Sequence, residues 1–497
     1  MATASTASKL TQLVATQWLF FVASLLACAA AWLLPKLLKQ DPLSRIPVIG
    51  LDIGNAEKRQ GAFMKDADVV AVSPFFLSEL KNLPEDTVSF SEHIEEFMQT
   101  KYTNIRADRP IIPHVVKKDL TPALNRLNPV IAEEVDQSFR EELPPCQDYT
   151  PVNINNKLLR IVAKVSGRIF IGPELCRSED YIDSAIKYTI EVMGAQKAVT
   201  MLKPWKRIFK AASLPEVKSL HEREKAAKDY LRPVIQQRKK AEKEDPDYQK
   251  PDDLLQWVLD ADLSQFGQQD DQEIASIQLG LIFAAIHTTT LTATNAFYSV
   301  AATPEIIPEL REEIRSVLRE YGTFTTQALQ KMKKLDSFLR ETMRLYPLGL
   351  TSFNRKVLKT FTLSNGQVIP AGCMIEVPGY GISMDGEVYE DPERFDAFRS
   401  YRAREREGLD GVNKAGAGAA NQFVTVSPSN LTFGYGRHAC PGRFFAANEI
   451  KMIVSRALLD YDIKLVDGVT ERYPNLAFGT QNIPDVSKDL LFKRVAI

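Results

Sequence analysis

The sequence predicts a mainly α-helical protein with a small β-sheet region, preceded by an N-terminal transmembrane helix. Three observations indicate this class. Apolar residues recur at helical spacing through most of the stretch from residue 119 to about residue 336. Strand-like pieces separated by Asn-Gly and Ala-Gly turns follow at 361–363, 368–370 and 374–377. A long apolar run stands near the N-terminus.

Residues 1–35 are the predicted membrane anchor. The apolar run from 18 to 34 spans roughly 25 Å as a helix at ~1.5 Å per residue, and residues 14–16 extend it toward the ~30 Å of a bilayer core. The nearby basic residues are Lys9 before the run and Lys36, Lys39 and Arg45 after it. This asymmetry predicts that the rest of the chain faces the cytosol. A cleaved signal peptide is the alternative, because small residues lie at 27–31, but the long run and its basic exit favour a retained anchor.

The remaining chain divides by composition. Residues 36–50 contain two prolines and are predicted to form a stiff hinge before the main body, 51–497. Residues 408–429, rich in Gly, Ala, Asn and Ser, are predicted to form a long irregular loop. The stretches with the clearest helical pattern are 162–171, 182–193, 220–243 and 273–300.

Bulk composition excludes some classes of protein. The net charge of −1 gives no indication of nucleic-acid binding. The cysteines are odd in number and widely scattered, which does not fit a disulfide framework and fits a reducing compartment. They stand at positions 28, 146, 176, 373 and 440.

Cys440 is the strongest chemical signal in the chain. It stands in the run F-G-Y-G-R-H-A-C-P-G, from Phe433 to Gly442. A thiolate is a strong, soft metal ligand, and a single thiolate can serve as the axial ligand of haem iron. The interspersed glycines permit a tight loop that lies flat against a porphyrin and directs amide N–H groups at the sulfur.

This run resembles the haem-binding loop of the cytochrome P-450 monooxygenases, F-x-x-G-x-R-x-C-x-G. The resemblance implies haem b as the cofactor and Cys440 as the axial ligand of its iron. It also places Phe433, Gly434 and Gly442 in the haem loop. His438 stands where the family usually has arginine; either cation can hydrogen-bond a haem propionate, but histidine titrates near neutrality.

A second motif of the family stands upstream of the cysteine. The E-x-x-R of Glu341 and Arg344 places both residues on one helix face. The segment from 391 to 399 resembles the family's D-P-x-x-F-x-P-x-R and, by that register, makes Arg399 the third member of a buried Glu–Arg–Arg triad. We expect this triad to be structural, because a buried charge is tolerable only when it is paired.

The run L-I-F-A-A-I-H-T-T-T at 281–290 resembles the family's oxygen-activating helix. The resemblance implies that the Thr288 hydroxyl helps to protonate bound oxygen. His287 replaces the usual carboxylate, and two interpretations stay open: a proton relay, or a residue that only fills space and bonds locally. The His-Thr-Thr arrangement looks like that of fungal enzymes that oxidise diterpenoids and prenylated indoles.

Two arginines are candidate haem contacts. Arg355 matches the family position that binds a propionate. Arg126 lies in the helix where many members have W-x-x-x-R, although Pro122 replaces the tryptophan, and an ordinary surface arginine is the alternative. The segments expected to face substrate contain no acidic or strongly basic residue, which favours a bulky lipophilic substrate. They are 111–116, 282–288, 348–353 and 477–481.

The resemblance further implies one large catalytic domain, 51–497, anchored in the endoplasmic reticulum membrane. O2 would be the oxidant, with electrons from NADPH delivered by a separate NADPH–cytochrome P-450 reductase. A haem-thiolate isomerase or dehydratase that needs no external electrons is the alternative enzyme, and Thr288 argues against it. A haem-dependent sensor without turnover is a third hypothesis. The interval 51–69 is short for the family, and both a reduced sheet and an imperfect gene sequence would explain it.

Overall fold

The computed structural model describes residues 69–106, 109–261, 266, 270–409 and 421–495. The predicted anchor, the hinge and residues 51–68 lie outside the described residues. Within the described part, Thr360–Ala371 forms one compact unit and the remaining residues form a second. The small unit is a hairpin in which β5 (Phe361–Thr362) pairs antiparallel with β6 (Val368–Ile369).

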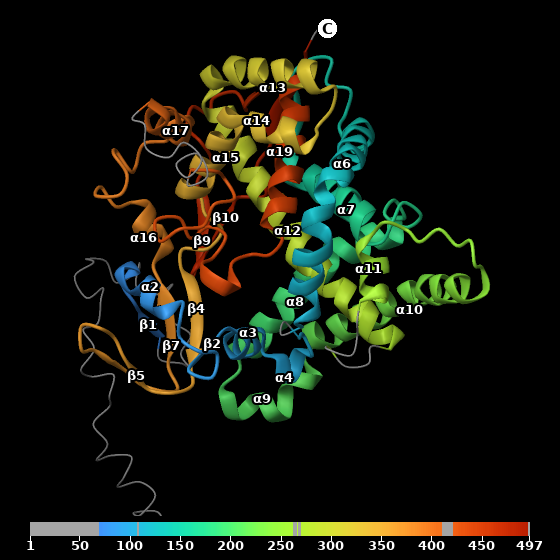
Figure 1. The fold of residues 1–497 in the computed structure, drawn as a ribbon, viewed down its shortest axis with the longest axis vertical. Helices are drawn as coiled ribbons and strands as arrows, with labels where there is room; N and C mark the ends of the chain where they lie inside the picture. The colour runs from blue at the N-terminus through green and yellow to red at the C-terminus, as the bar shows by residue number, and fades with distance from the viewer. Residues whose placement is uncertain (1–68, 107–108, 262–265, 267–269, 410–420, 496–497) are drawn as a thin grey trace, which may run out of the picture. The chain divides into compact units, whose positions relative to one another are not determined.

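The large unit is mainly helical, as predicted, with short strands before and after the long helices (Figure 1). Its α-helices are α2 (Leu77–Leu80), α3 (Phe90–Met98), α4 (Thr100–Thr103), α5 (Ile111–Val115), α6 (Thr121–Glu142), α7 (Ile154–Phe170), α8 (Glu179–Met201), α9 (Pro204–Lys210), α10 (Pro215–Glu244), α11 (Leu254–Asp260), α12 (Asp271–Ala302), α13 (Ile307–Tyr321), α14 (Thr326–Lys331), α15 (Lys333–Leu345), α16 (Gly379–Ser383), α17 (Arg399–Leu409) and α19 (Arg443–Asp460).

The strands of the large unit form two small sheets and a hairpin. The first sheet has the order β1-β7-β4-β2, with β1 parallel to β7 and the other pairs antiparallel. The second has the order β3-β11-β8, and β9 pairs with β10. The strands are β1 (Val69–Ala71), β2 (Val88–Ser89), β3 (Thr150–Val152), β4 (Ser352–Val357), β7 (Met374–Val377), β8 (Tyr461–Leu465), β9 (Asn475–Phe478), β10 (Gln481–Pro484) and β11 (Leu490–Arg494).

Helix α12 is the central element of the large unit. It packs against α7, α8, α10, α19 and α15, and Figure 1 shows it running through the middle of the helical region. The Asp270 carboxylate caps its N-terminus by accepting the N–H of Glu273 at 2.8 Å. By length and hydropathy this helix could cross a membrane, but more than half of its most apolar window is buried. Its apolar character therefore reflects its place in the core.

Candidate active site

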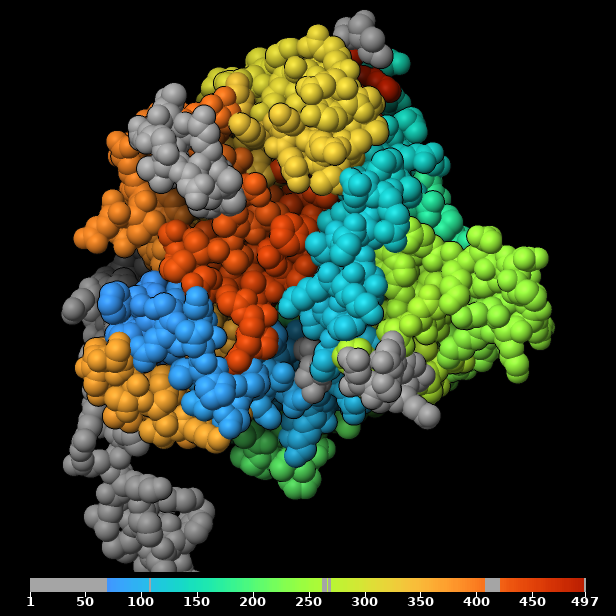
Figure 2. Space-filling view, viewed as in Figure 1, coloured from blue at the N-terminus to red at the C-terminus, as the bar shows by residue number. Residues whose placement is uncertain are grey.

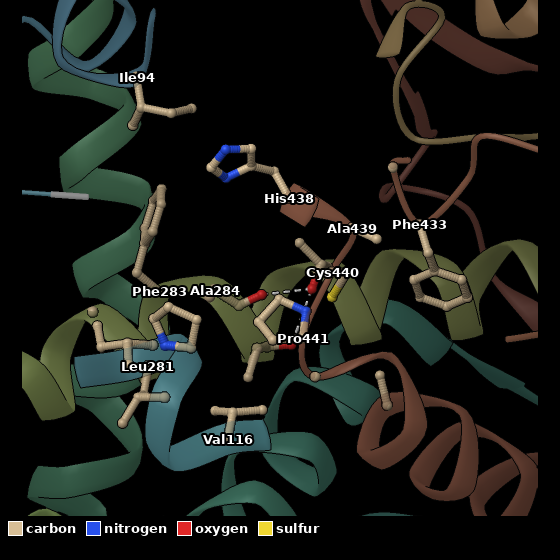
Figure 3. Close-up of a pocket in the computed structure, with 18 of the residues that line it drawn as sticks. Ile94, Val116, Leu281, Phe283, Ala284, Phe433, His438, Ala439, Cys440 and Pro441 are labelled. Carbon is tan, nitrogen blue, oxygen red and sulfur yellow. Dashed lines mark hydrogen bonds between the residues drawn. The ribbon is translucent and has the colours of Figure 1, made fainter. Parts of the chain in front are cut away.

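A cavity of about 1280 Å³ lies between α12 and the loop that carries Cys440. This volume exceeds the ~300–1,000 Å³ of an ordinary small-molecule pocket. Figure 3 shows Cys440, Pro441 and His438 on the loop, with Phe283 and Ala284 of α12 on the other side of the pocket. The cavity is therefore large enough for a cofactor together with a substrate.

The cysteine loop is held by its own backbone. The N–H of Cys440 donates to the carbonyl of Phe433 at 2.8 Å. Gly434 and Gly436 have φ of 74° and 71°, in the left-handed region that other residues rarely adopt. Gly442 differs from the expectation for these glycines: its φ of −85° is open to any residue. A side chain at this position would project into open space at the pocket wall. Glycine therefore leaves room here for a group bound in the pocket.

The surroundings of the sulfur favour a bound thiolate. Burial raises the pKa of the Cys440 thiol, and the backbone N–H groups of Gly442 and Arg443 act in the opposite direction by donating to the sulfur. These groups open α19, so the helix dipole also favours negative charge there. A coordinated metal would complete the deprotonation.

The wall opposite the cysteine is one face of α12. The lining residues Gly280, Ala284, Thr288 and Thr292 follow each other at intervals of four. The Thr288 hydroxyl donates to the carbonyl of Ala284 at 2.7 Å and lies 3.3 Å from that of Ala285. The structure therefore places a hydroxyl and two small side chains at the pocket surface.

His287 points away from this wall. Its Nε2 lies 2.9 Å from the carbonyl oxygen of Ile186 in α8. Burial lowers the pKa of the imidazole, so the ring is neutral near pH 7. His287 is not among the described residues that line the pocket. This geometry corresponds to the second of the two interpretations, a locally bonded packing residue.

Basic side chains and aromatic rings gather on and beside the cysteine loop. The His438 ring lines the pocket, stacks on Phe90 with centroids 4.9 Å apart, and bonds Glu85 through Nε2 at 3.0 Å. Burial lowers the pKa of His438, and the nearby charge of Arg355 lowers it further. Arg355 is not itself among the described lining residues; its guanidinium packs against the lining residue Phe90, 5.1 Å from the ring centre.

Arg355 provides the test of whether an anionic cofactor fits. It is only 4% exposed, and its guanidinium donates to the adjacent Asn354 carbonyl. Within the described part of the chain it forms no ion pair with a carboxylate, and burial lowers its pKa to about 10. A buried cation without a carboxylate to neutralise it is costly. Together with the thiol and the open space at Gly442, it fits a flat, anionic, metal-containing group such as haem.

The structure places Arg126 as in the second of its two interpretations, an ordinary surface arginine. It is on the surface, where its guanidinium makes a bidentate ion pair with Asp252 at 2.7 Å, and it does not line the described pocket. Lys117 lines the pocket instead, in the π-helical turn between α5 and α6. Lys117 is not among the site residues predicted from the sequence. The sequence signal that could have found Lys117 is helical spacing. Pro113, Val116, Lys117 and Leu120 stand at i, i+3, i+4 and i+7, so they share one helix face, and all four line the pocket.

Glu341, Arg344 and Arg399 meet behind the pocket wall and are not among the described residues that line it. The Arg344 guanidinium donates two hydrogen bonds to the Glu341 carboxylate, at 2.8 and 2.9 Å. Arg399 Nε donates to the same carboxylate at 3.2 Å. The three side chains connect α15 with the segment before α17, because Arg344 also donates to the carbonyls of Ser383 and Pro392 at 2.6 and 2.7 Å. Every charge in the cluster is paired, as a buried site requires.

Two expectations about the substrate lining differ from the structure. Residues 477–481 do not line the described pocket; they are the end of β9, the turn and the start of β10, and this hairpin pairs with residues 348–350. The lining also contains charged residues, contrary to the apolar lining predicted from the sequence. They lie on segments that the sequence analysis did not assign to the site, and include Lys101, Arg109, Glu224, Lys228 and Glu273.

Comparisons with known proteins agree with this geometry. The family model described as "Cytochrome P450" matches residues 84–485. "Cytochrome P450 monooxygenase ATR3" of Stachybotrys chlorohalonatus is 38% identical over 95% of each chain. "Cytochrome P450 monooxygenase paxP" of Penicillium paxilli is 36% identical over 87% of this chain and 82% of its own. The solved structure "Retinoic acid bound cyanobacterial CYP120A1" is similar in fold, with a TM-score of 0.65 at 18% identity over 90% of this chain and 95% of its own.

Proposed function

This chain belongs to the cytochrome P450 family and is a monooxygenase whose cofactor is haem b, and we propose that it oxidises a bulky lipophilic intermediate of fungal secondary metabolism. A terpenoid or prenylated indole is the proposed substrate class. One oxygen atom of O2 enters the substrate and the other leaves as water, with the electron pair supplied by NADPH. The relatives' fungal origin and the largely apolar wall around Leu281 and Phe283 support this proposal.

Different residues of the chain are proposed to bind the iron and the propionates of the haem. Cys440 is the proposed axial ligand, and the N–H groups at the start of α19 stabilise its negative charge. Lys117 and the buried Arg355 are the cations proposed to hold the propionates, and His438 is proposed to contribute as a neutral hydrogen-bonding ring at the pocket wall. Haem with a thiolate ligand supplies O2 activation, because the thiolate pushes electron density toward O–O cleavage.

The position of Thr288 is the observation that favours monooxygenation over the electron-independent isomerase or dehydratase. Its hydroxyl lies in the pocket wall among the small side chains of Ala284 and Ala285, where it can hold and pass a proton. We propose that it controls whether electrons reach product. Thr288→Ala should still bind substrate and consume NADPH but release peroxide, so that product formed per NADPH falls. Full coupling in this variant would favour the electron-independent isomerase or dehydratase.

Electrons are proposed to come from a separate NADPH–cytochrome P450 reductase at the outer side of the cysteine loop. In Figure 2 the orange-red segment that follows residue 421 reaches the surface between the blue N-terminal helices and the cyan α6. Arg437 is an exposed residue of this loop. Residues 1–35 are proposed to anchor the enzyme in the endoplasmic reticulum membrane. Deletion of residues 1–40 should release much of the protein from membranes and leave the haem spectrum unchanged.

A further inference from the structure

The pocket continues along α12 well beyond Thr288. Lining residues recur on the same helix face back to Ser276 and Glu273, near the start of the helix. The stretch from 273 to 288 is about 22 Å long at ~1.5 Å rise per residue. The pocket therefore extends for roughly that length from the proposed oxygen-activating hydroxyl to a second end.

This second end is polar. Glu273 lines it and forms an ion pair with Arg109, with Nη1 and Oε1 2.7 Å apart. Tyr188 of α8 and Glu224 of α10 line the same end, and the Tyr188 hydroxyl donates to the Glu224 carboxylate at 3.3 Å. These helices pack against each other and against α12, so the position of both side chains is set by the fold.

Glu224 differs from Glu273, whose carboxylate is paired with Arg109. Within the described residues, the Glu224 carboxylate forms no ion pair with a basic side chain. Burial raises the pKa of Glu224, while the more distant charges of Lys228, His221 and Arg109 act against this rise. A carboxylate has about four acceptor positions, and Tyr188 occupies one of them. A half-buried acceptor with unused capacity is stabilised by a further donor.

We propose that Glu224, supported by Tyr188, binds a hydroxyl or N–H group at one end of an elongated lipophilic substrate, whose other end reaches the oxidation site. This inference rests on the proposed function and specifies its substrate class: a lipophile with a hydrogen-bond donor far from the oxidised carbon. The intervening wall is apolar, with Ile112, Leu281 and Phe283. Glu224 thus acts in positioning the substrate and selecting it.

A matched pair of probes tests the proposal. Geranylgeraniol is a long lipophile with one terminal hydroxyl, and its methyl ether has the same chain without the donor. Binding of each to the detergent-solubilised, haem-loaded full chain is measured by calorimetry. The wild type should bind the alcohol about tenfold more tightly than the ether. Glu224→Leu should reduce this ratio to about one, and Glu224→Gln, which keeps a weaker acceptor, should give about threefold.

Glu222→Leu is the control, because Glu222 is exposed on the same helix and does not line the described pocket. It should keep the wild-type ratio. Equal binding of the two probes by the wild type, binding of neither, or an unchanged ratio in both Glu224 variants would overturn the proposal. The reduced CO spectrum, recorded on each preparation first, separates this result from failure of the proposed function: a wild type without the thiolate spectrum contradicts the haem-thiolate assignment itself.

Discussion

The His287 imidazole bonds the carbonyl oxygen of Ile186 in α8, 101 residues earlier in the chain, at 2.9 Å. The carbonyl can accept only if Nε2 carries the proton, so this contact selects the tautomer. The bond ties α12, next to Thr288, to the helix that also carries Tyr188. The residue in the position of the family's usual carboxylate is thus used between helices and not at the pocket wall.

His287→Ala is expected to lower the stability of the fold by about 1 kcal/mol, because the hydrogen bond that joins α12 to α8 is lost. The ratio of product to NADPH should stay at the wild-type value. Because burial lowers the pKa of the imidazole, wild-type coupling should also be flat between pH 6.5 and 8. Thermal unfolding and NADPH stoichiometry measure the two effects. Uncoupling similar to that of Thr288→Ala would instead support a proton relay.

Cys440→Ser is expected to abolish the thiolate CO spectrum and all turnover, since a neutral hydroxyl cannot supply the same electron density to iron. Cys176→Ser is the matched control. Cys176 is fully buried in another part of the fold, and its substitution should leave the spectrum intact. Spectra of the reduced, CO-treated proteins decide the outcome. A native spectrum from Cys440→Ser would remove the assignment of the axial ligand.

Glu341→Ala is expected to cost ~3–5 kcal/mol, because the buried Arg344 and the partly buried Arg399 would lose their carboxylate. The measured result should be little haem-loaded protein. Glu312→Ala provides the comparison, because its ion pair with Arg319 is exposed and should be worth less than about 1 kcal/mol. Haem content per folded chain is the readout. A well-folded, haem-replete Glu341→Ala would reject the structural role.

Glu449→Gln is expected to stabilise the protein at pH 7.5 more than at pH 5.5. Burial raises the pKa of Glu449 to about 8, and Ser166 at 3.1 Å is the hydrogen-bond partner that the structure gives it. The folded state therefore holds a proton that the unfolded chain has lost. Wild-type stability should fall as pH rises from about 4.5 toward 8, by at most ~1.4 kcal/mol per pH unit.

The amide that replaces the carboxyl in Glu449→Gln does not titrate, so this variant should lose the slope. Apparent Tm at a series of pH values measures it, with the exposed Glu305→Gln as the control that should retain the wild-type slope. Parallel pH profiles for wild type and Glu449→Gln would show that the carboxyl ionises in the folded protein as easily as in the unfolded chain.

The sequence by itself determined the class of the fold, the family and the cysteine loop. These follow from local patterns: helical periodicity, the glycines around Cys440, and the E-x-x-R spacing that places Glu341 and Arg344 on one face. The predicted strand 374–377 coincides with β7. Helix periodicity even indicates that Thr288, in register with Ala284, faces the pocket while its neighbour His287 is turned about 100° away.

Only the tertiary structure decided what covers each helix face. The bond of His287 to Ile186, the surface position of Arg126, the presence of Lys117 at the pocket and the polar end around Glu224 all depend on contacts between segments far apart in the chain. A local pattern specifies which residues share a face. The neighbour that packs on that face is selected by the burial of the whole core, and for this reason the substrate-binding end of the pocket was absent from the sequence analysis.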